Sequence, residues 1–542
     1  MDVKMNFLLP FFLLFPSILG NVRIDPLVDA PVGLIRGLRA TDGDYSKFMG
    51  IPYAKINDNN PFGASIPITK FDGEFEAYND AKTCPQYRFG QIIGVLDCLH
   101  LNVFVPNSAN SQNKVPVMVW IHGGSFHKGT GGISENGPKY LVKHNVILVT
   151  INYRLGPYGF MCLDTPEIPG NQGLKDQLTA LRWIKNNIES FGGDTNKITL
   201  FGVSAGGHSI DLHLLSNHDN LFNNIILQSG SSLATTVLIE HDKQAPIKLS
   251  EQLGYITDSL DDAITFLTQS DPNMVIAAVV ATDIEFKPCA EQKFDDVESF
   301  INNDWINTNA IVPKIRNLPI LTGFTSKEQA STLADKSSEY FANLNVIHKE
   351  LAKIFNFNTE ELTEMETYVR SFYLGDNGYS KEYKDEIGNF LSDHTYIHPI
   401  HRSIRRYLTN SAANVFLYMF SYVGGRNYEQ NTFNDTIDGT VHGDELGYIF
   451  TKLNATEPSD ADKDMIDKVT ALWTNFAKYS DPTPEITDLL PVKWLPVESD
   501  QWYYLNIDSQ LTLGSRPYHK RMAFWDLFYK LNGKKQKGYV AL

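Results

Sequence analysis

Apolar residues in the first half of the chain follow two alternating patterns. Short, nearly continuous apolar runs occur at Val115–Ile121, 145–152 and Asn224–Gln228, and such runs are typical of strands buried on both faces. Between the last two runs, residues 173–191 carry apolar side chains at helical spacing, and the glycine pair 192–193 ends that segment. Strands that alternate with helices predict a mostly parallel sheet with helices on both faces.

The second half of the chain has a less regular pattern. Strand-like runs return at 318–324, 415–422 and 502–507. The segments 240–310 and 330–400 are charged and helical in spacing, and we interpret them as a helical cap over one edge of the sheet. Because no repeat, low-complexity segment or linker composition interrupts the chain, residues 21–542 are expected to form one large α/β domain.

A sharp turn follows the strand pattern that begins at Lys197. The sequence there reads KITLFGVSAGG, so that Ser204 stands between Gly202 and Gly206. Glycines relieve the backbone crowding of a strand that turns at once into a helix, and a serine between them is held exposed at the strand end. On this stretch alone, an ordinary strand-to-helix turn and a reactive serine are equal alternatives.

Two segments of the chain offer backbone N–H groups that could bind an oxyanion. Ala205 follows Ser204 directly, which is the position that contributes an N–H group in such turns. Gly123 and Gly124 follow the run Val115–Ile121, and in open α/β sheets the active site lies at the carboxyl ends of the strands. The three N–H groups are therefore candidates for an oxyanion hole.

A serine also needs a base and an acid before it can act as a nucleophile. Among 14 histidines, His442 stands out because it lies in the segment 440–446, just before an apolar run. Glu328 follows the strand pattern at 318–324. The order Ser204, Glu328, His442 is the order of the triad residues in α/β-hydrolases, so the sequence predicts a Ser-Glu-His triad.

The composition and the net charge argue against several other classes of function. The chain has 542 residues and a formal net charge of −16, which disfavours binding to nucleic acid or to an anionic membrane surface. The four cysteines and the histidines show no zinc-type spacing, and there is no HExxH motif. We therefore expect neither a metal nor another cofactor.

Residues 1–20 have the pattern of a secretory signal peptide. Lys4 precedes the apolar run 7–15, which is too short to span a bilayer and contains a proline. We expect cleavage near residue 20 and secretion, and no later run is long enough for a membrane anchor. In a secreted protein, the sequons at Asn434 and Asn454 are candidate glycosylation sites on surface loops.

If the protein is secreted, its four cysteines can form disulfides. Cys84 and Cys98 are close in sequence, and in an oxidising compartment they could close a small loop. Cys162 and Cys289 are far apart in the chain, and the sequence leaves open whether they pair.

With these motifs, the chain resembles the carboxylesterase/cholinesterase family, also called type-B carboxylesterases, over nearly the whole mature chain. Matching blocks occur in family order: FMGIPYA, DCLHLNVFVP, WIHGGSF, NYRLGPYGF, NQGLKDQ, ALRWIKNNIESFGGD, GVSAGG, QSG, TSKEQ and HGDELGYIF. The resemblance implies an α/β-hydrolase fold. The site residues that it implies are the triad Ser204, Glu328 and His442, the oxyanion hole Gly123, Gly124 and Ala205, the supporting residue Ser229, and a Cys84–Cys98 disulfide.

The chain departs from the family pattern at several positions. Val203 stands where the family usually has glutamate, and Gln329 stands where it usually has glycine. A cysteine pair near 250–275 is missing, and the loop between Cys84 and Cys98 lacks the tryptophan that holds a quaternary ammonium in cholinesterases. Choline esters are therefore not expected as substrates. Juvenile-hormone esterases, which the chain also resembles, usually carry glutamine at the position of Val203.

The resemblance implies a secreted, insect-type serine carboxylesterase that cleaves small-molecule esters through an acyl-enzyme intermediate. We expect a monomer with no cofactor, no nucleic-acid partner and no membrane anchor. The alternative is a non-catalytic binding or adhesion protein, because some members of the family act only through their surface. The sequence does not identify the ester, which could be an odorant, a hormone, a xenobiotic or a dietary compound.

Overall fold

The structure is a computed structural model that describes residues 25–235, 237–301 and 311–537. The predicted signal peptide at 1–20 lies outside the described residues. The strands of the central sheet are β3 (Leu38–Arg39), β4 (Tyr45–Pro52), β10 (His100–Pro106), β11 (Val115–Ile121), β12 (Ile147–Ile151), β13 (Gly193–Val203), β14 (Asn224–Gln228), β15 (Ile320–Thr325), β16 (Val415–Phe420), β17 (Tyr503–Ile507) and β18 (Thr512–Ser515). The strands outside it are β1 (Leu27–Ala30), β2 (Gly33–Arg36), β5 (Ala54–Lys55), β6 (Ile66–Pro67), β7 (Phe75–Glu76), β8 (Gln86–Arg88) and β9 (Gln91–Ile93).

The central sheet has eleven strands in the order β18-β17-β16-β15-β14-β13-β11-β12-β10-β4-β3. The seven strands from β17 to β12 in this order pair in parallel. The strands at the two ends, β18 on one side and β10, β4 and β3 on the other, pair antiparallel. The predicted mostly parallel sheet is therefore confirmed.

Helices lie beside the sheet and in a separate cap. The helices beside the sheet are α1 (Lys139–Val142), α2 (Gly156–Phe160), α3 (Gln172–Asn187), α4 (Ala205–Leu215), α12 (His398–Thr409) and α13 (Asp460–Tyr479). The remaining helices are α5 (Ala245–Gln252), α6 (Leu260–Gln269), α7 (Pro272–Thr282), α8 (Ser338–Ala342), α9 (Val346–Ile354), α10 (Thr359–Leu374), α11 (Lys384–Ser392) and α14 (His519–Asn532).

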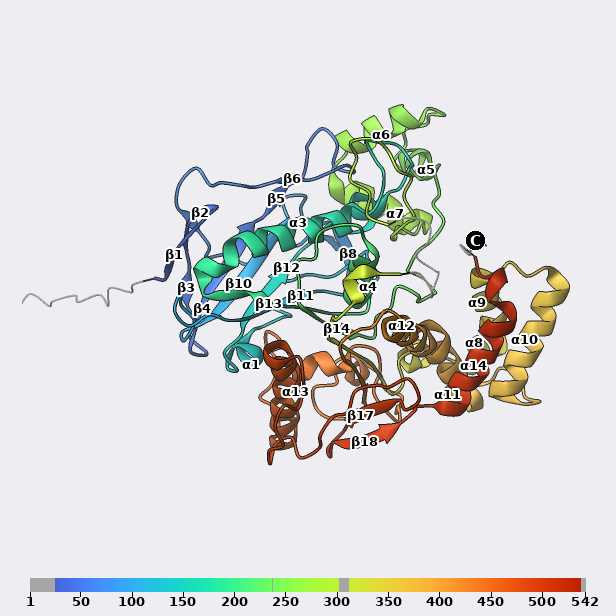
Figure 1. Ribbon diagram of the computed structural model, residues 1–542. Helices are drawn as coiled ribbons and strands as arrows, with labels where there is room; N and C mark the ends of the chain where they lie inside the picture. The colour runs from blue at the N-terminus through green and yellow to red at the C-terminus, as the bar shows by residue number, and fades with distance from the viewer. Residues whose placement is uncertain (1–24, 236, 302–310, 538–542) are drawn as a thin grey trace, which may run out of the picture.

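Strand β11 shows why the central strands are apolar along their whole length. Val117 and Val119 belong to one apolar cluster of the core, whereas Met118 and Trp120 belong to another. Successive side chains of a strand point to opposite faces. Helices α3 and α4 contribute to the first cluster and α13 to the second, so both faces of the sheet are covered (Figure 1). A strand covered on both faces needs no polar side.

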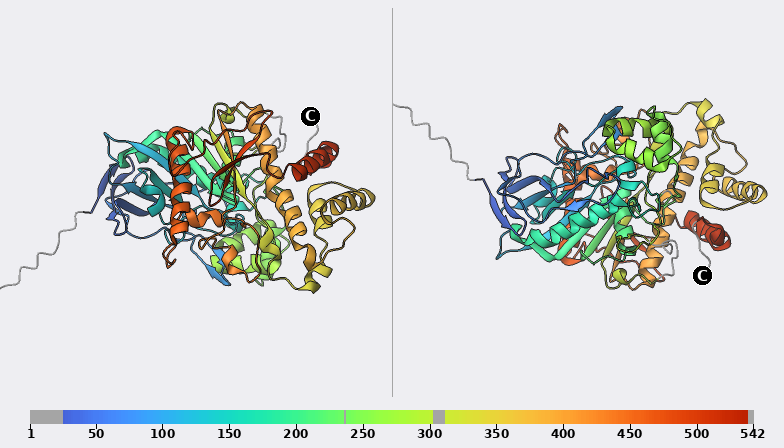
Figure 2. Two further views of the ribbon diagram at one scale, coloured as in Figure 1. Left: turned by 90° about the horizontal axis from the view of Figure 1, so that it is seen from below. Right: turned by 90° about the horizontal axis from the view of Figure 1, so that it is seen from above.

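The predicted cap consists of two helix groups. Helix α5 packs against both α6 and α7, and α8 to α11 form a second group with α14. Figure 1 and Figure 2 show the second group at the end of the molecule opposite β1 and β2, and the first group nearer the middle. Helix α14 joins the cap although it lies far away in sequence, because the rings of Phe372 and Phe524 stack with centroids 4.1 Å apart.

The order of the strands reverses at β11. The chain passes from β11 to β12 on one side and then to β13 on the other side of β11. Connections diverge at such a point and leave a crevice outside the carboxyl ends of the strands. Gly123 and Gly124 follow β11 and Ser204 follows β13, so the topology brings these two predicted site segments together.

A buried ion pair fixes the loop after β12 to helix α3. Arg154 Nε and Nη2 donate to the two carboxylate oxygens of Asp176 at 2.7 and 2.8 Å, and neither side chain is exposed. Arg154 Nη1 donates to the carbonyl oxygens of Pro61 and Gly63. Because both charges are paired and hydrogen-bonded, the pair meets the condition under which a protein interior holds ions.

Candidate active site

Ser204 lies at the turn between β13 and α4, in a strained backbone conformation. Its φ is 54° and its ψ is −124°, a region that residues with a Cβ rarely adopt. The glycines on either side are required by close packing, because a Cβ at Gly202 or at Gly206 would lie 2.6 or 1.9 Å from the carbonyl oxygen of Ile121. The turn therefore has the geometry of a nucleophile elbow.

Two of the three predicted oxyanion donors, Ala205 and Gly123, adjoin this serine, and Gly124 follows Gly123 in the chain. Ala205 is the first residue of α4, so its N–H is one of the amides that the start of a helix leaves free. A Cβ at Gly123 would lie 3.2 Å from Ser204 Cβ, which places Gly123 directly against the serine. Within the described residues, the N–H groups of Gly123, Gly124 and Ala205 donate to no protein acceptor, so they are available to a ligand oxygen.

His122 holds the loop that carries the two glycines. Its Nδ1 lies 2.8 Å from the carbonyl oxygen of Gly123, and its ring stacks on Tyr153 with centroids 4.4 Å apart. The hydroxyl of Tyr153 donates to the carbonyl oxygen of His122 at 2.9 Å. Burial lowers the pKa of His122 to about 4, so the ring is neutral and supports the loop without adding charge.

Glu328 and His442 meet through two contacts. Nδ1 of His442 lies 2.6 Å from Oε2 of Glu328, and the backbone N–H of His442 donates to the carbonyl oxygen of Glu328 at 3.1 Å. Burial lowers the pKa of His442, but the charge and hydrogen bond of Glu328 outweigh it, so the pKa lies above its ordinary value of 6.5. Glu328 itself is completely buried.

The second oxygen of Glu328 is also occupied. Oε1 accepts hydrogen bonds from the hydroxyl of Ser229 at 2.6 Å and from the N–H of Thr325 at 2.7 Å. With His442 on Oε2, the buried carboxylate is therefore hydrogen-bonded at both oxygens. Ser229 thus lies where a residue that orients Glu328 is needed.

Two further groups near the site have no signal in the sequence pattern. The ring of Tyr396 lies against the His442 imidazole, with centroids 4.5 Å apart. Glu445 is completely buried, and its Oε1 accepts a hydrogen bond from the Gln228 side chain at 3.0 Å. Burial raises the pKa of Glu445 to about 7. Glu445 stands in the HGDEL segment, but nothing in that segment distinguishes it from an exposed acid.

The cysteines form two disulfides, Cys84–Cys98 and Cys162–Cys289. The second pair, which the sequence left open, joins segments 127 residues apart. His241 lies beside it, and the ligand atoms of these three side chains lie within 4.8 Å of one another. Because both sulfurs are bonded to each other, they are not available as thiolates for a metal.

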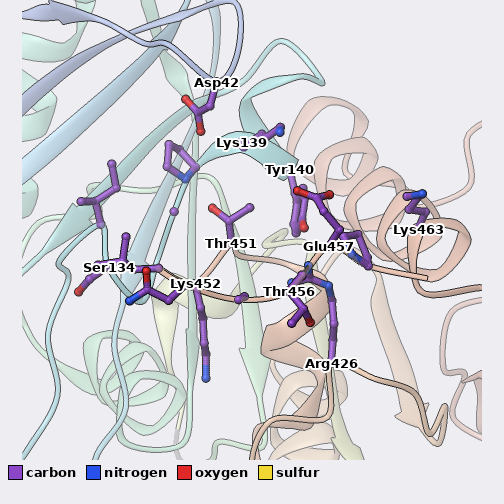
Figure 3. Close-up of a pocket in the computed structure, with 17 residues that line it drawn as sticks. Asp42, Ser134, Lys139, Tyr140, Arg426, Thr451, Lys452, Thr456, Glu457 and Lys463 are labelled. Atoms are coloured by element: carbon purple, nitrogen blue, oxygen red, sulfur yellow. Dashed lines mark hydrogen bonds between the residues drawn. The ribbon is translucent and has the colours of Figure 1, made fainter. Parts of the chain in front are cut away.

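The two candidate glycosylation sites, Asn434 and Asn454, are exposed. The side-chain amide of Asn434 donates to Asp335 at 3.4 Å. Asn454 lines a pocket of about 550 Å³ between the segments 133–140 and 451–458 (Figure 3). None of the predicted active-site residues lines this pocket, so it is separate from the Ser204 site.

Within residues 25–235, 237–301 and 311–537, no helix combines the length and the apolar character that crossing a membrane requires.

Comparisons with known proteins show the family to which this chain belongs. The model of the family described as "Carboxylesterase family" matches residues 24–525. Esterase FE4 of Myzus persicae is 31% identical over 500 residues, covering 86% of this chain and 86% of its own. Venom carboxylesterase-6 of Apis mellifera is 30% identical over 485 residues, covering 84% and 86%.

The crystal structure of juvenile hormone esterase from Manduca sexta, with OTFP covalently attached, superimposes with a TM-score of 0.80 at 26% identity. The match covers 93% of this chain and 100% of that chain. Sequence and fold therefore lead to the same assignment. The chain belongs to the carboxylesterase family, has the α/β-hydrolase fold, and is a serine hydrolase of carboxylic esters.

Proposed function

We propose that Ser204, Glu328 and His442 are the catalytic triad of this ester hydrolase. The observation that carries the proposal is the 2.6 Å contact between His442 Nδ1 and Glu328 Oε2. The strained backbone of Ser204 at the turn after β13 supports it. A histidine that donates from Nδ1 to a carboxylate leaves Nε2 as the proton acceptor. Within the described residues, this Nε2 is buried and has no hydrogen-bond partner.

In the first half of the reaction, Ser204 is acylated. His442 Nε2 takes the hydroxyl proton as Ser204 Oγ attacks the ester carbonyl, and the N–H groups of Gly123, Gly124 and Ala205 stabilise the oxyanion. His442 then gives this proton to the departing alcohol. In the second half, water attacks the acyl-enzyme by the same route and the acid is released.

The experiment is ester hydrolysis and fluorophosphonate labelling of Ser204→Ala. We expect kcat to fall by more than about 10³-fold and labelling to disappear, while Ser108→Ala, a change at an exposed serine, leaves both unchanged. Retained turnover in Ser204→Ala would reject the proposed nucleophile. A folded wild-type protein that neither binds the label nor cleaves esters would favour the non-catalytic binding function instead.

We also propose that the enzyme is secreted after removal of residues 1–20 and that residues 21–542 form one domain. Two disulfides support an oxidising compartment, and a single sheet that extends from β3 to β18 supports one folding unit. We propose a monomer that acts on small esters, which size-exclusion chromatography with light scattering tests. Mass spectrometry of the secreted protein tests cleavage and the glycans on Asn434 and Asn454.

A further inference from the structure

The pocket of about 550 Å³ that lies apart from the proposed active site has fixed walls. Its walls are the segments 133–140 and 451–458, and two backbone hydrogen bonds join them. The N–H of Gly137 donates to the carbonyl oxygen of Thr451 at 2.9 Å, and the N–H of Thr451 donates to that of Gly137 at 3.2 Å. The pocket is therefore preformed, and its volume is typical of sites for small molecules.

Arg426 is the buried charge of this pocket. The residue is 5% exposed and lines the pocket, and Figure 3 shows its side chain extending toward Tyr140 and Thr456. Two of its five N–H groups donate to neutral oxygens, Nη1 to the hydroxyl of Tyr428 at 2.6 Å and Nη2 to the carbonyl of Thr456 at 2.8 Å. The ring centroids of Tyr140 and Tyr428 lie 5.7 and 6.0 Å from the guanidinium carbon.

None of these neighbours balances the charge of the guanidinium. Among the residues that the structure describes, no carboxylate forms a hydrogen bond or an ion pair with Arg426, and its Nε has no hydrogen-bond partner. The buried carboxylate of Asp462 is bound elsewhere, to the hydroxyl of Ser459 at 2.8 Å and the N–H of Gly425 at 3.2 Å. Because buried charges in proteins are normally paired, an anion from outside the chain would complete this site.

The rest of the lining suits an anion that carries an apolar group. Asp42 already accepts a hydrogen bond from the hydroxyl of Tyr45 at 2.6 Å, and Lys463 pairs with Asp460 at 3.0 Å. The charged lining is still positive in a chain of formal net charge −16, because four bases face two acids: Lys139, Arg426, Lys452, Lys463, Asp42 and Glu457. The apolar surface comes from Ile133, Pro138, Tyr140, Leu453 and Pro458.

We propose that this pocket is a second binding site, which takes a small apolar carboxylate. The carboxylate pairs with the N–H groups of Arg426 that have no acceptor, since the planar guanidinium matches the geometry of a carboxylate. The ring of Tyr140 and the aliphatic lining accommodate the apolar group. The site is separate from Ser204 and does not depend on the proposed triad.

The test is calorimetric titration of the full-length protein with 1-naphthoate and with 1-naphthamide, which has nearly the same shape and no charge. We expect naphthoate to bind and naphthamide to bind at least about 10-fold more weakly. Arg426→Gln should weaken the binding of naphthoate by about 10- to 100-fold, because hydrogen bonds to a charged group are lost. The matched control is Arg182→Gln, which removes an arginine from an exposed ion pair with Glu298 and should leave the affinity unchanged.

Two variants at one exposed position test the place of binding without altering Arg426. Thr456 lines the pocket with an exposed side chain, and its hydroxyl completes the sequon of Asn454. Thr456→Ala removes the sequon and leaves the pocket open, so it should bind naphthoate as wild type does. Thr456→Trp also removes the sequon but fills the pocket, and it should lose binding. The thermal midpoints of both variants confirm folding.

Three results would overturn the inference. Equal affinity for naphthoate and naphthamide would show that the charge of Arg426 is not used. Binding that disappears once a fluorophosphonate occupies Ser204 would place the ligand in the proposed active site instead. Binding that appears only in Thr456→Ala would mean that a glycan on Asn454 occupies the pocket of the wild-type protein. If the protein takes up no label, the proposed triad fails, and the Arg426 and Thr456 variants still decide the present inference.

Discussion

Ser204 occupies a backbone conformation that costs about 1–3 kcal/mol for a residue with a Cβ. Neighbouring contacts hold it there: its N–H donates to the carbonyl oxygen of Gln228 at 2.9 Å, and its own carbonyl accepts from the N–H of His208 at 2.7 Å. Both contacts come from elements that the sheet already fixes. The rest of the fold therefore holds Ser204 in this strained conformation, which places its hydroxyl at the end of the strand.

The pH dependence should follow His442. The pKa of this residue is raised above 6.5, with Glu328 and Glu445 both favouring the charged form. In the proposed mechanism only the neutral imidazole of His442 accepts the Ser204 proton, so the acid limb of kcat/KM should have its midpoint above pH 6.5. Activity should be lost as the pH falls through that value. Glu445, whose pKa is about 7, is partly ionised near this midpoint. Glu445→Gln removes that partial negative charge and should shift the midpoint slightly to lower pH.

A pH–rate profile from pH 5 to 9 checks this prediction. The same measurement on Asp97→Asn, which changes a carboxylate in an exposed ion pair with Lys82, is the control and should leave the midpoint in place. A wild-type midpoint at or below 6.5 would contradict the raised pKa.

Val203 is explained by its surroundings. The side chain is 6% exposed and belongs to the apolar cluster that also contains Phe201, Tyr448 and Phe450. In the parallel pairing, Val203 lies beside Gln228, which is already hydrogen-bonded to Glu445 and to the indole N–H of Trp473. Because the side chain of Gln228 already has these hydrogen bonds, an apolar side chain at position 203 leaves no polar group without a partner. The departure from the family therefore changes the packing below the elbow rather than the proposed triad.

At the scale of elements, the patterns that repeat along the chain were predictable. Continuous apolar runs identify the central strands because both faces of the sheet are covered, and the motif residues follow from their place at the strand ends. The predicted end of α3 was wrong in detail. The helix expected over residues 173–191 ends at Asn187, and the chain continues as a 3-10 turn over Ile188–Phe191. The side chain of Asn187 bonds the carbonyl oxygen of Trp183 and the N–H of Val32, contacts that spacing cannot reveal.

Tyr396 could not be predicted for a different reason. It stands in a charged, helical segment with no motif, and the His442 ring that it contacts is far from it in sequence. Its orientation depends on a π-helical turn over Asp393–Ile397, whose first residue is fixed by Tyr373 and Arg521. A site residue that depends on one irregular turn and on distant packing has no local signal.

The loop after β12 should depend strongly on its buried ion pair. Asp176→Asn leaves Arg154 charged and without its carboxylate in a site where neither side chain is exposed. Such a loss costs about 3–5 kcal/mol, whereas Asp97→Asn in the exposed pair with Lys82 should cost less than about 1 kcal/mol. Urea unfolding monitored by tryptophan fluorescence measures both. Equal losses would contradict the assigned difference in burial.

At the scale of the whole molecule, the Cys162–Cys289 disulfide connects the segment after α2 to the segment after α7. It therefore ties the first cap group to the part of the chain that leads into α3. The Cys84–Cys98 disulfide spans only 14 residues. The two bonds thus restrict the unfolded chain on very different length scales.

Removing the long-range disulfide should cost more stability. In the chain-entropy account, a cross-link over a loop of about 15 residues contributes about 3 kcal/mol and one over about 100 residues nearly 5 kcal/mol. We expect Cys162→Ser/Cys289→Ser to lower the thermal midpoint more than Cys84→Ser/Cys98→Ser does. Differential scanning calorimetry compares the pairs, and the reverse order would show that loop length does not dominate.

The parallel order of β13 to β17 has a consequence for synthesis on the ribosome. Ser204 is synthesised early, but the proposed acid Glu328 and the proposed base His442 follow β15 and β16. At translation rates of roughly 5–20 residues per second, the proposed triad is complete only on the order of tens of seconds after Ser204 is made. During that time the sheet ends at an open strand, the kind of edge on which unwanted pairing begins. Until its last third is made, the nascent chain therefore lacks the complete proposed triad and exposes that edge, which has to be protected during synthesis.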